Sequence, residues 1–351
     1  MHVPDGFIDA PVSIAAGVAA AGAVAVSLRG ARRELEDSAA PLAGLVAAFI
    51  FAVQMLNFPV AAGTSGHLLG GALAAILVGP YTGVLCVSVV LLMQGVLFAD
   101  GGLTALGVNV MNMAVVTVVV AYAVFRALVK VLPKTRRSVT AAAFTGALLS
   151  VPGAAVMFTL FYALGGTTDV PLGKVFTAMV GVHVLIGLGE AVITAATVGA
   201  VLAVRPDLVH GARGLSTPLK LRVGGELVDA PATAPAAPAG GPRSTRPVWI
   251  TGLLTALVLA GFVSYYASAS PDGLEKVAAD KGIDRNERQH AAAGSPLADY
   301  SVKDVTDTRL SGGLAGVIGV GATVAVGTGI FWTVRRRRAE DLTATSTSAA
   351  G

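Results

Sequence analysis

The chain has 351 residues, of which 54% are hydrophobic and 13% are charged, and its mean hydropathy is +0.73. Because soluble domains carry about a quarter charged residues, this composition excludes an ordinary soluble domain and indicates a polytopic membrane protein. The net charge of +4 comes from basic residues at the ends of apolar runs and in the terminal run Arg335 to Arg338. That placement indicates membrane topology rather than binding to nucleic acid.

The chain begins Met1-His2-Val-Pro-Asp-Gly-Phe7, and a histidine beside a free α-amine can chelate a metal ion. The Met1 amine, the deprotonated His2 amide and the His2 imidazole nitrogen nearest the backbone close two fused chelate rings. Planar nitrogen donors suit Ni(II) and Cu(II), and imidazole does not exclude Co(II). Most chain ends are frayed, so the rest of the sequence must show whether this N-terminus binds a metal ion. No basic stretch precedes the first apolar run, which argues against a cleaved secretory signal and favours retention of Met1.

Nine apolar runs follow, and all but one are long enough to span a bilayer, which takes at least about 17 residues. They occupy 11–28, 41–59, 68–79, 81–99, 103–129, 139–164, 175–204, 248–267 and 311–334. The short run Leu68 to Gly79 is consistent with a short span, a tilted span or a half-helix lining a cavity.

Lys and Arg collect after the first, fifth, seventh and ninth runs. All four groups are cytoplasmic if the N-terminus is outside and the short run crosses the membrane. We therefore predict an all-α polytopic protein of the cell (plasma) membrane, with a seven-span helical bundle and a two-span helical hairpin. Its N-terminus is predicted outside and its C-terminus in the cytoplasm.

The polar segments divide the chain. Residues 1–204 form the seven-span unit, and 205–246 form a cytoplasmic linker that contains the Pro/Ala/Gly stretch 230–242. Residues 247–334 form the two-span unit, whose outer loop 268–309 is the most polar part of the chain. We predict that the tail 335–351 is disordered.

Several polar side chains fall on the predicted outer side. Asn57 and His67 flank a glycine-rich loop, and a shared location with the N-terminus favours His67 as a metal ligand over a loop imidazole satisfied by water. Gln94, Asp100, Asn109 and Asn112 lie near the outer ends of two spans. With Asn57, they either hold the N-terminal segment and orient the imidazoles or join helices without a role at a site.

His183 and Glu190 lie seven residues apart on one helical face. They are candidates for a proton relay or a second metal site. A packing role is favoured because Gly181, Gly187 and Gly189 permit close contact between helices.

Several catalytic patterns are absent from the sequence. It has no Gly-x-x-x-x-Gly-Lys-Ser/Thr phosphate loop, no His-Glu-x-x-His and no Gly-x-Ser-x-Gly. Its one cysteine, Cys86, lies in an apolar run and is interpreted as a small buried hydrophobe. The sequence therefore predicts no enzyme, and the energy for any transport must come from a partner or an ion gradient.

Four motifs occur in the order typical of a known family: Met1-His-Val-Pro-Asp-Gly-Phe7, Gly63-Thr-Ser-Gly-His-Leu-Leu-Gly-Gly71, Phe98 to Met113, and His183 to Thr194. Over residues 1–204 the chain resembles the CbiM/NikM family of cobalt and nickel transport proteins, the substrate-specific components of energy-coupling factor ABC transporters. The second unit, with Pro271-Asp-Gly-Leu-Glu275, resembles a fused CbiN/NikN-type (PDGLE) component.

This resemblance implies that Met1, His2 and His67 hold the metal with four nitrogens in a near-planar site. It implies no resident cofactor, because Co2+ or Ni2+ is the substrate. It also implies partners, namely a transmembrane coupling subunit and two cytoplasmic ATPase subunits, with no nucleic acid. Family frequency favours cobalt for cobalamin synthesis, and nickel is the alternative.

Two other functions remain open from the residues. An ion-gradient-driven carrier would use His183 and Glu190 as its proton path, although no repeated halves occur in the apolar pattern. A membrane scaffold or sensor would use loop 268–309 as a binding platform.

Overall fold

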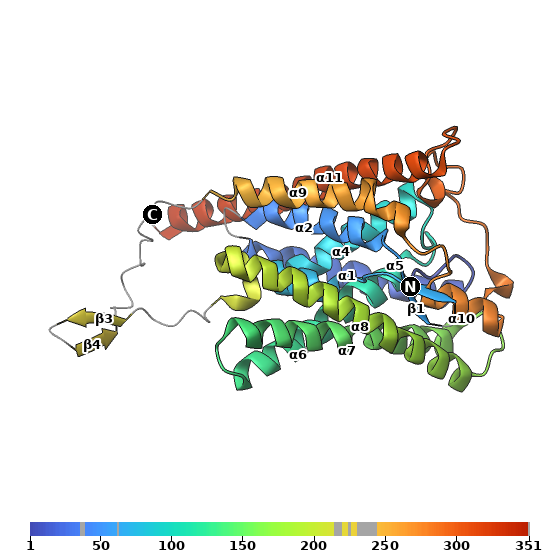
Figure 1. The fold of residues 1–351 in the computed structure, drawn as a ribbon, viewed down its shortest axis with the longest axis horizontal. Coiled ribbons are helices and arrows are strands. Elements are labelled where there is room, and N and C mark those ends of the chain that lie inside the picture. Colours follow the sequence, from blue (N-terminus) through green and yellow to red (C-terminus); the bar gives the residue numbers. More distant parts are fainter. Residues whose placement is uncertain (36–38, 62, 214–219, 224–225, 230–243, 350–351) are drawn as a thin grey trace.

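The computed structural model describes residues 1–35, 39–61, 63–213, 220–223, 226–229 and 244–349, and it is all-α apart from two small hairpins (Figure 1). The first unit contains α1 (Ala10–Glu34), α2 (Ala39–Gln54), α3 (Gly71–Val78), α4 (Pro80–Leu97), α5 (Leu106–Asn109), the π-helix η1 (Val110–Val116), α6 (Thr117–Val131), α7 (Arg136–Gly165) and α8 (Leu172–Val204). The second unit contains α9 (Arg246–Gly261), α10 (Gly273–Lys281) and α11 (Thr308–Ala349). Short 3-10 turns occupy 206–208, 210–212, 263–266, 284–286 and 298–300.

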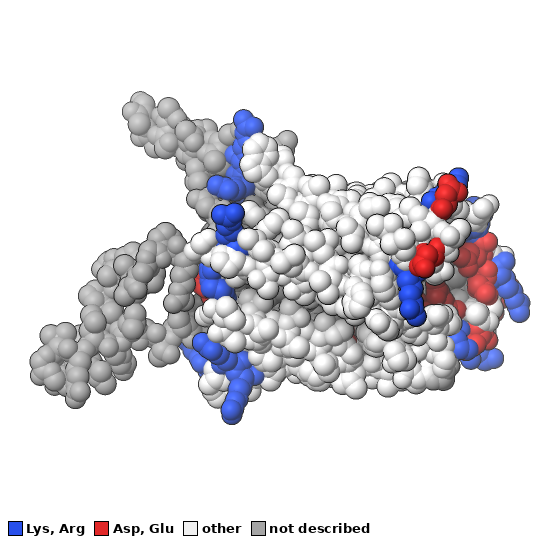
Figure 2. All heavy atoms as spheres, turned by 45° about the horizontal axis from the view of Figure 1, so that its top comes forward, with Lys and Arg blue, Asp and Glu red and all other residues white. Residues whose placement is uncertain are grey.

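Seven helical segments in the described residues are long and apolar enough to cross a membrane, and α2 is a shorter apolar helix. They are 10–34, 80–97, 106–131, 136–165, 172–204, 246–266 and 308–336. Figure 2 shows a wide band nearly free of charged side chains across the visible face of the molecule. At one end of this band nearly all visible charged side chains are Lys or Arg, and at the other end Lys and Arg are mixed with most of the visible Asp and Glu. The chain is therefore an integral, polytopic membrane protein of the predicted all-α class.

The two units pack along one face of the bundle, where α2 lies against both α9 and α11 (Figure 1). Small residues allow this approach: a Cβ on Gly44 would meet Thr328, and a Cβ on Gly252 would meet Leu45. At the end of the bundle that holds the N-terminus of the chain, Phe51 and Phe98 pack on Tyr300 of the second unit. Their ring centroids lie 6.3 and 4.9 Å from that of the tyrosine ring. The second unit is thus part of one packed structure with the first.

The short run between α2 and α4 begins with a hairpin and ends as a buried helix. Strands β1 (Phe58–Ala61) and β2 (Thr64–Gly66) pair antiparallel, a four-residue stretch containing His67 follows, and every residue of α3 is buried. An eight-residue helix rises only about 12 Å, so α3 alone is too short to cross a bilayer. Non-helical backbone at this depth is tolerated because protein surrounds it.

The run predicted at 103–129 is not one regular helix. It starts with α5, continues through the seven-residue π-helix η1 and becomes α6. Asn109 is the last residue of α5, and Asn112 lies within η1. π-Helical segments often occur at functional sites, and this one lies where the N-terminus is bound.

Two features of the linker and tail differ from the sequence analysis. The backbone of α11 continues to Ala349, where we expected disorder from residue 335; most residues from Arg335 to Leu342 are good helix formers, and neither Pro nor Gly interrupts this stretch. Strands β3 (Lys220–Val223) and β4 (Glu226–Asp229) form a hairpin in the expected linker. The Pro/Ala/Gly stretch 230–242 lies outside the described residues.

Glu34 joins the end of α1 to the start of α4. Its carboxylate accepts hydrogen bonds from Tyr81 N at 3.2 Å, Thr82 N at 2.7 Å and Thr82 Oγ1 at 2.9 Å. The first N–H groups of a helix have no partner within the helix, so this buried carboxylate serves as a cap supplied from a distant segment.

Replacing Glu34 by Ala should therefore lower the free energy of unfolding by about 1–3 kcal/mol, because it leaves buried donors unsatisfied. The measurement is thermal unfolding of the detergent-purified protein, with Arg33→Ala, at an exposed neighbouring position, as the matched control. Equal melting of the two variants would contradict this capping role.

Candidate metal centre

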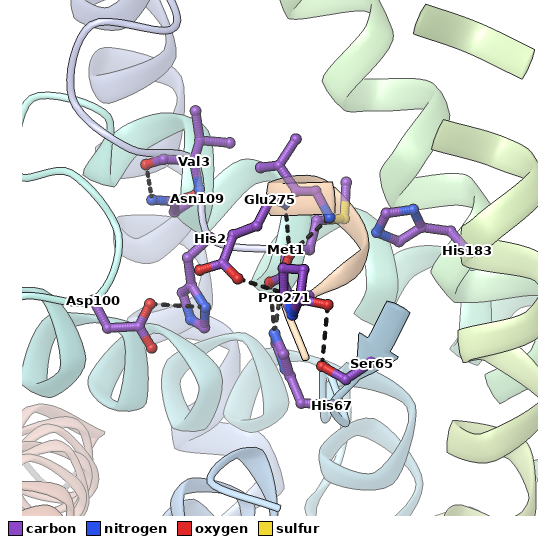
Figure 3. Close-up of polar contacts among 12 residues, drawn as sticks. Met1, His2, Val3, Ser65, His67, Asp100, Asn109, His183, Pro271 and Glu275 are labelled. Carbon is purple, nitrogen blue, oxygen red and sulfur yellow. Dashed lines mark hydrogen bonds and ion pairs between the residues drawn. The ribbon is translucent and has the colours of Figure 1, made fainter. Parts of the chain in front are cut away.

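The first three residues are buried at the end of the bundle where the carboxylates gather. Met1 is 2% exposed, His2 9% and Val3 0%. Asn109 binds both backbone groups of Val3: its Oδ1 accepts from Val3 N at 2.7 Å, and its Nδ2 donates to Val3 O at 3.1 Å (Figure 3). Asp5 is held in turn by Thr104 N at 2.8 Å. The N-terminus is therefore fixed in place by the segment that leads into η1.

The Met1 ammonium lies at the centre of the site. It donates to His67 Nε2 at 2.7 Å and to Asp272 Oδ2 at 2.6 Å. Because an ammonium group only donates, His67 presents a lone pair at Nε2. The other ring nitrogen, Nδ1, then carries the proton and donates to Leu68 O at 3.0 Å. Nε2 is therefore the His67 nitrogen that is ready to bind a cation.

The His2 ring stacks on the His67 ring, with centroids 5.1 Å apart and planes inclined by 19°. Its Nδ1 lies 3.2 Å from Asp100 Oδ1 (Figure 3). Its Nε2 lies 3.0 Å from Gln94 Oε1. When Nε2–H donates to Gln94, the lone pair resides on Nδ1, the nitrogen nearest the backbone. Burial lowers the pKa of His2 to about 4, so the imidazole is neutral at neutral pH.

Asp272 of the second unit completes the group. His2, His67 and Asp272 each offer a ligand atom, and these atoms lie within 4.8 Å of one another. Burial acts to raise the pKa of Asp272, but the Met1 ammonium and His67 outweigh this effect and hold the pKa well below its usual range. The carboxylate is therefore ionised beside three nitrogen donors.

Glu190 anchors the stretch that carries His67. From the buried middle of α8, its carboxylate accepts from Leu69 N at 2.7 Å and Gly70 N at 3.1 Å. His183 instead contacts the backbone of its own helix, with Nδ1 2.7 Å from Met179 O. These hydrogen bonds give Glu190 a structural role at the metal centre. They do not join it to His183 as a proton relay would require.

Asn57 and Asn112, the other two residues predicted to support the site, lie in different surroundings. Asn57 lines the cavity over the site, and its backbone oxygen accepts from Ser268 N at 2.7 Å. Asn112 is fully buried in η1, and neither of its side-chain amide atoms has a hydrogen-bond partner among the described residues. Asn112 therefore makes no side-chain hydrogen bond to the N-terminal segment, unlike Asn109.

A cavity of about 870 Å³ opens over the centre and is lined by both units. Its acidic lining residues outnumber its two arginines, Arg288 and Arg309, and are Asp5, Asp100, Asp272, Glu275, Asp284, Glu287 and Asp299. Carboxylates in a concave wall concentrate cations from solution. The cavity is consequently suited to admit a metal cation to the nitrogen donors.

These features define a polytopic membrane protein for handling a transition-metal ion. Residues 2–208 match the CbiM family, described as "Cobalt uptake substrate-specific transmembrane region", and residues 246–336 match the PDGLE domain. The chain belongs to the CbiM family and carries a fused PDGLE domain. It is thus a membrane component of metal transport, in agreement with the resemblance found in its sequence motifs.

Individual proteins give the same result. A putative metal transport protein of Haloquadratum walsbyi is 40% identical over 209 residues, which cover 60% of this chain and 93% of that protein. A putative fused nickel transport protein NikMN of Archaeoglobus fulgidus is 43% identical over 217 residues, 60% of this chain and 68% of that protein. A crystal structure of a truncated transition metal transporter has a TM-score of 0.51 and 27% identity, covering 58% of this chain and 99% of that one.

The sequence analysis assigned Asp272 no role at the site. Its local signal was present, since Asp272 followed by Glu275 is the pattern that starts a helix with a capping box. That pattern predicts where α10 begins. It does not predict that Asp272 contacts Met1, which lies 271 positions away in the sequence. Glu190 was named as a candidate for a relay, a second metal site or packing, but its contact with the backbone after His67 was not predicted, for the same reason.

Replacing Asn109 by Ala should loosen the N-terminal segment, because two hydrogen bonds to Val3 are lost. We expect an amine-directed acylating reagent to label Met1 about tenfold faster. This corresponds to a loss of about 1.4 kcal/mol in the free energy that keeps the N-terminal segment bound. Peptide mass spectrometry of the labelled N-terminus gives this rate. Asn57→Ala is the matched control, since no side-chain hydrogen bond joins Asn57 to Val3; equal acceleration in both variants would contradict the role of Asn109.

Proposed function

We propose that this chain captures Co2+ or Ni2+ at the outer face of the plasma membrane, as the substrate-specific component of an energy-coupling factor transporter. The observation that carries the proposal is the burial of the Met1 amine 2.7 Å from His67 Nε2, beside the stacked His2 ring. Chain ends are normally frayed and solvated. A buried, hydrogen-bonded terminus in an acidic cavity is better explained by a role in binding.

The binding chemistry follows from the donor atoms. The Met1 amine, the His2 amide, His2 Nδ1 and His67 Nε2 together supply four nitrogens to one cation. The amine and the amide must each lose a proton when they bind, so metal binding releases protons and weakens as pH falls. The His2 ring is neutral already and does not add to this proton release above about pH 4.

The proposed orientation of the protein in the membrane rests on the distribution of its charged side chains. At the end of the apolar band that is remote from the metal centre, nearly all visible charged side chains are Lys or Arg, whereas at the metal-centre end Lys and Arg are mixed with Asp and Glu (Figure 2). The positive-inside rule places that end in the cytoplasm and the metal centre outside. The N-terminus then lies outside and the C-terminus inside, with all nine apolar runs of the two units crossing the membrane, the stretch from His67 to α3 included.

The energy for transport must come from a partner or an ion gradient, because the sequence lacks a phosphate-binding loop. We propose a transmembrane coupling subunit and two cytoplasmic ATPase subunits, in keeping with the family resemblance. An ion-gradient-driven carrier is the second candidate, but Glu190 and His183 bind separate backbone groups. Uptake in proteoliposomes that requires ATP and the coupling subunits separates the first proposal from the second.

The substrate is cobalt or nickel. The family description names cobalt uptake, whereas fused relatives from Archaeoglobus fulgidus and Rhodobacter capsulatus are named nickel transport proteins. A four-nitrogen set suits both ions. We propose cobalt on the family description, with nickel as the alternative, and calorimetric titration with each ion decides between them.

Extending the chain by one residue before Met1 should abolish tight binding. The extension converts the amine into an amide that is a poor metal donor, and it adds atoms where Met1 is only 2% exposed. Calorimetry of the free and extended proteins with Co(II) and Ni(II) tests this. The same affinity in both proteins would move the metal site elsewhere in the molecule.

His67→Ala should weaken binding by at least about 100-fold, since it removes a ligand and not merely a supporting contact. His290→Ala is the matched control: His290 also lines the cavity, but its Nε2 lies 3.1 Å from Gly101 O. Both variants should reach the membrane in equal amounts. Equal metal affinity of the His67 variant and the wild type would exclude His67 as a ligand.

A further inference from the structure

We propose that Asp272 of the second unit is an oxygen ligand of the transported metal ion, so that the fused unit completes the metal site. The proposal rests on the function proposed above and adds a donor that the N-terminal nitrogen set does not contain. It gives the PDGLE segment a direct part in binding the substrate.

The distances among three donor atoms fit one cation. Asp272 Oδ2 lies 2.6 Å from the Met1 nitrogen and 3.5 Å from His67 Nε2, and those two nitrogens are 2.7 Å apart. A point about 2.0–2.2 Å from all three atoms satisfies these separations, and that is the usual length of metal bonds to nitrogen and carboxylate oxygen. The proton that the amine donates to Asp272 would be replaced by the metal ion.

Helix capping fixes which oxygen faces the site. Asp272 Oδ1 accepts from Leu274 N at 2.7 Å and from Glu275 N at 2.9 Å at the start of α10. The Glu275 side chain completes the capping box by accepting from Asp272 N at 2.8 Å. With Oδ1 engaged by the helix, Oδ2 is the oxygen left to face Met1. A ligand whose orientation is already set loses little entropy when metal binds.

Hydrogen bonds from Ser65 and the close packing of Gly273 hold the segment around Asp272 against the first unit. Ser65, two residues before His67, donates to Pro271 O through its backbone N at 2.9 Å and through its Oγ at 3.3 Å (Figure 3). Its Oγ also donates to Ser270 O at 2.7 Å. Gly273 packs on α8 so closely that a Cβ would lie 2.7 Å from Ile186 and 3.2 Å from His183. His67 and Asp272 are consequently held on adjoining segments whose spacing is set by backbone contacts.

Charge supports the same assignment. Asp272 is 7% exposed, and a buried charge must be paired. In the structure the Met1 ammonium supplies the pairing charge. A divalent ion bound to a deprotonated His2 amide leaves one positive charge on the nitrogen set, which the Asp272 carboxylate balances. Asp100 also lies near His2, but it is 27% exposed and can be hydrated.

The test uses the full chain with a free N-terminus and two substitutions. Asp272→Asn and Asp272→Ser both retain an oxygen that can cap α10, since Asn and Ser are good N-cap residues, but both remove the site-facing carboxylate. We expect affinity for Co(II) to fall about 10- to 100-fold or more in each. X-ray absorption of the Co(II)-loaded proteins should show one oxygen neighbour fewer than in the wild type. Glu275→Gln is the matched control, because it removes a nearby cavity charge and keeps the capping oxygen.

The outcomes are distinct. If the wild type binds neither Co(II) nor Ni(II), the proposed function fails and this inference fails with it. If the wild type binds but Asp272→Asn has equal or tighter affinity and an unchanged metal coordination number, the inference alone is wrong, and Asp272 only neutralises the Met1 ammonium. An equal loss in Glu275→Gln would also overturn it, because the effect would then be a general one of cavity charge. Cooperative thermal unfolding of each variant verifies that it is folded.

Discussion

The structure depends on an ammonium group that is buried rather than solvated. Breaking a buried ion pair by removing one partner typically costs about 3–5 kcal/mol, so Met1 requires the nearby carboxylate of Asp272 and the lone pair of His67. That requirement joins three segments that are far apart in the chain. It also explains why the loop of the second unit lies over the site instead of extending into solvent.

The rest of the molecule keeps those three segments in register. Asn109 fixes the backbone beside Met1 and His2, and Glu190 fixes the stretch that follows His67. The second unit is held by its helices against α2 and by the Tyr300 hydroxyl, which donates to Asp100 Oδ2 at 2.6 Å. Because the backbone of each segment is bonded directly, the spacing of the donor atoms is set by contacts within the protein. The site is therefore preorganised.

Much of the architecture could be predicted because hydrophobic length is a local property of the sequence. Each apolar run contains a helix, and the amine of Met1 beside the imidazole of His2 is by itself a pattern that indicates metal chelation. The tertiary partners could not be predicted in this way. Nothing local indicates that Asp272 reaches Met1, that Glu190 binds the backbone after His67, or that the helix containing Asn112 widens into a π-helix. Each of these depends on which segments become neighbours, and periodicity does not specify that.

The covalent fusion of the two units affects how reliably the site is assembled. When a donor comes from a separate polypeptide, the fraction of sites that contain it depends on how much of that partner the membrane holds. Here Asp272 is on the same chain as Met1, so its effective concentration is set by the length of the connection and not by expression level. Every copy of the protein therefore carries its own carboxylate, and assembly of the centre is independent of dilution in the bilayer.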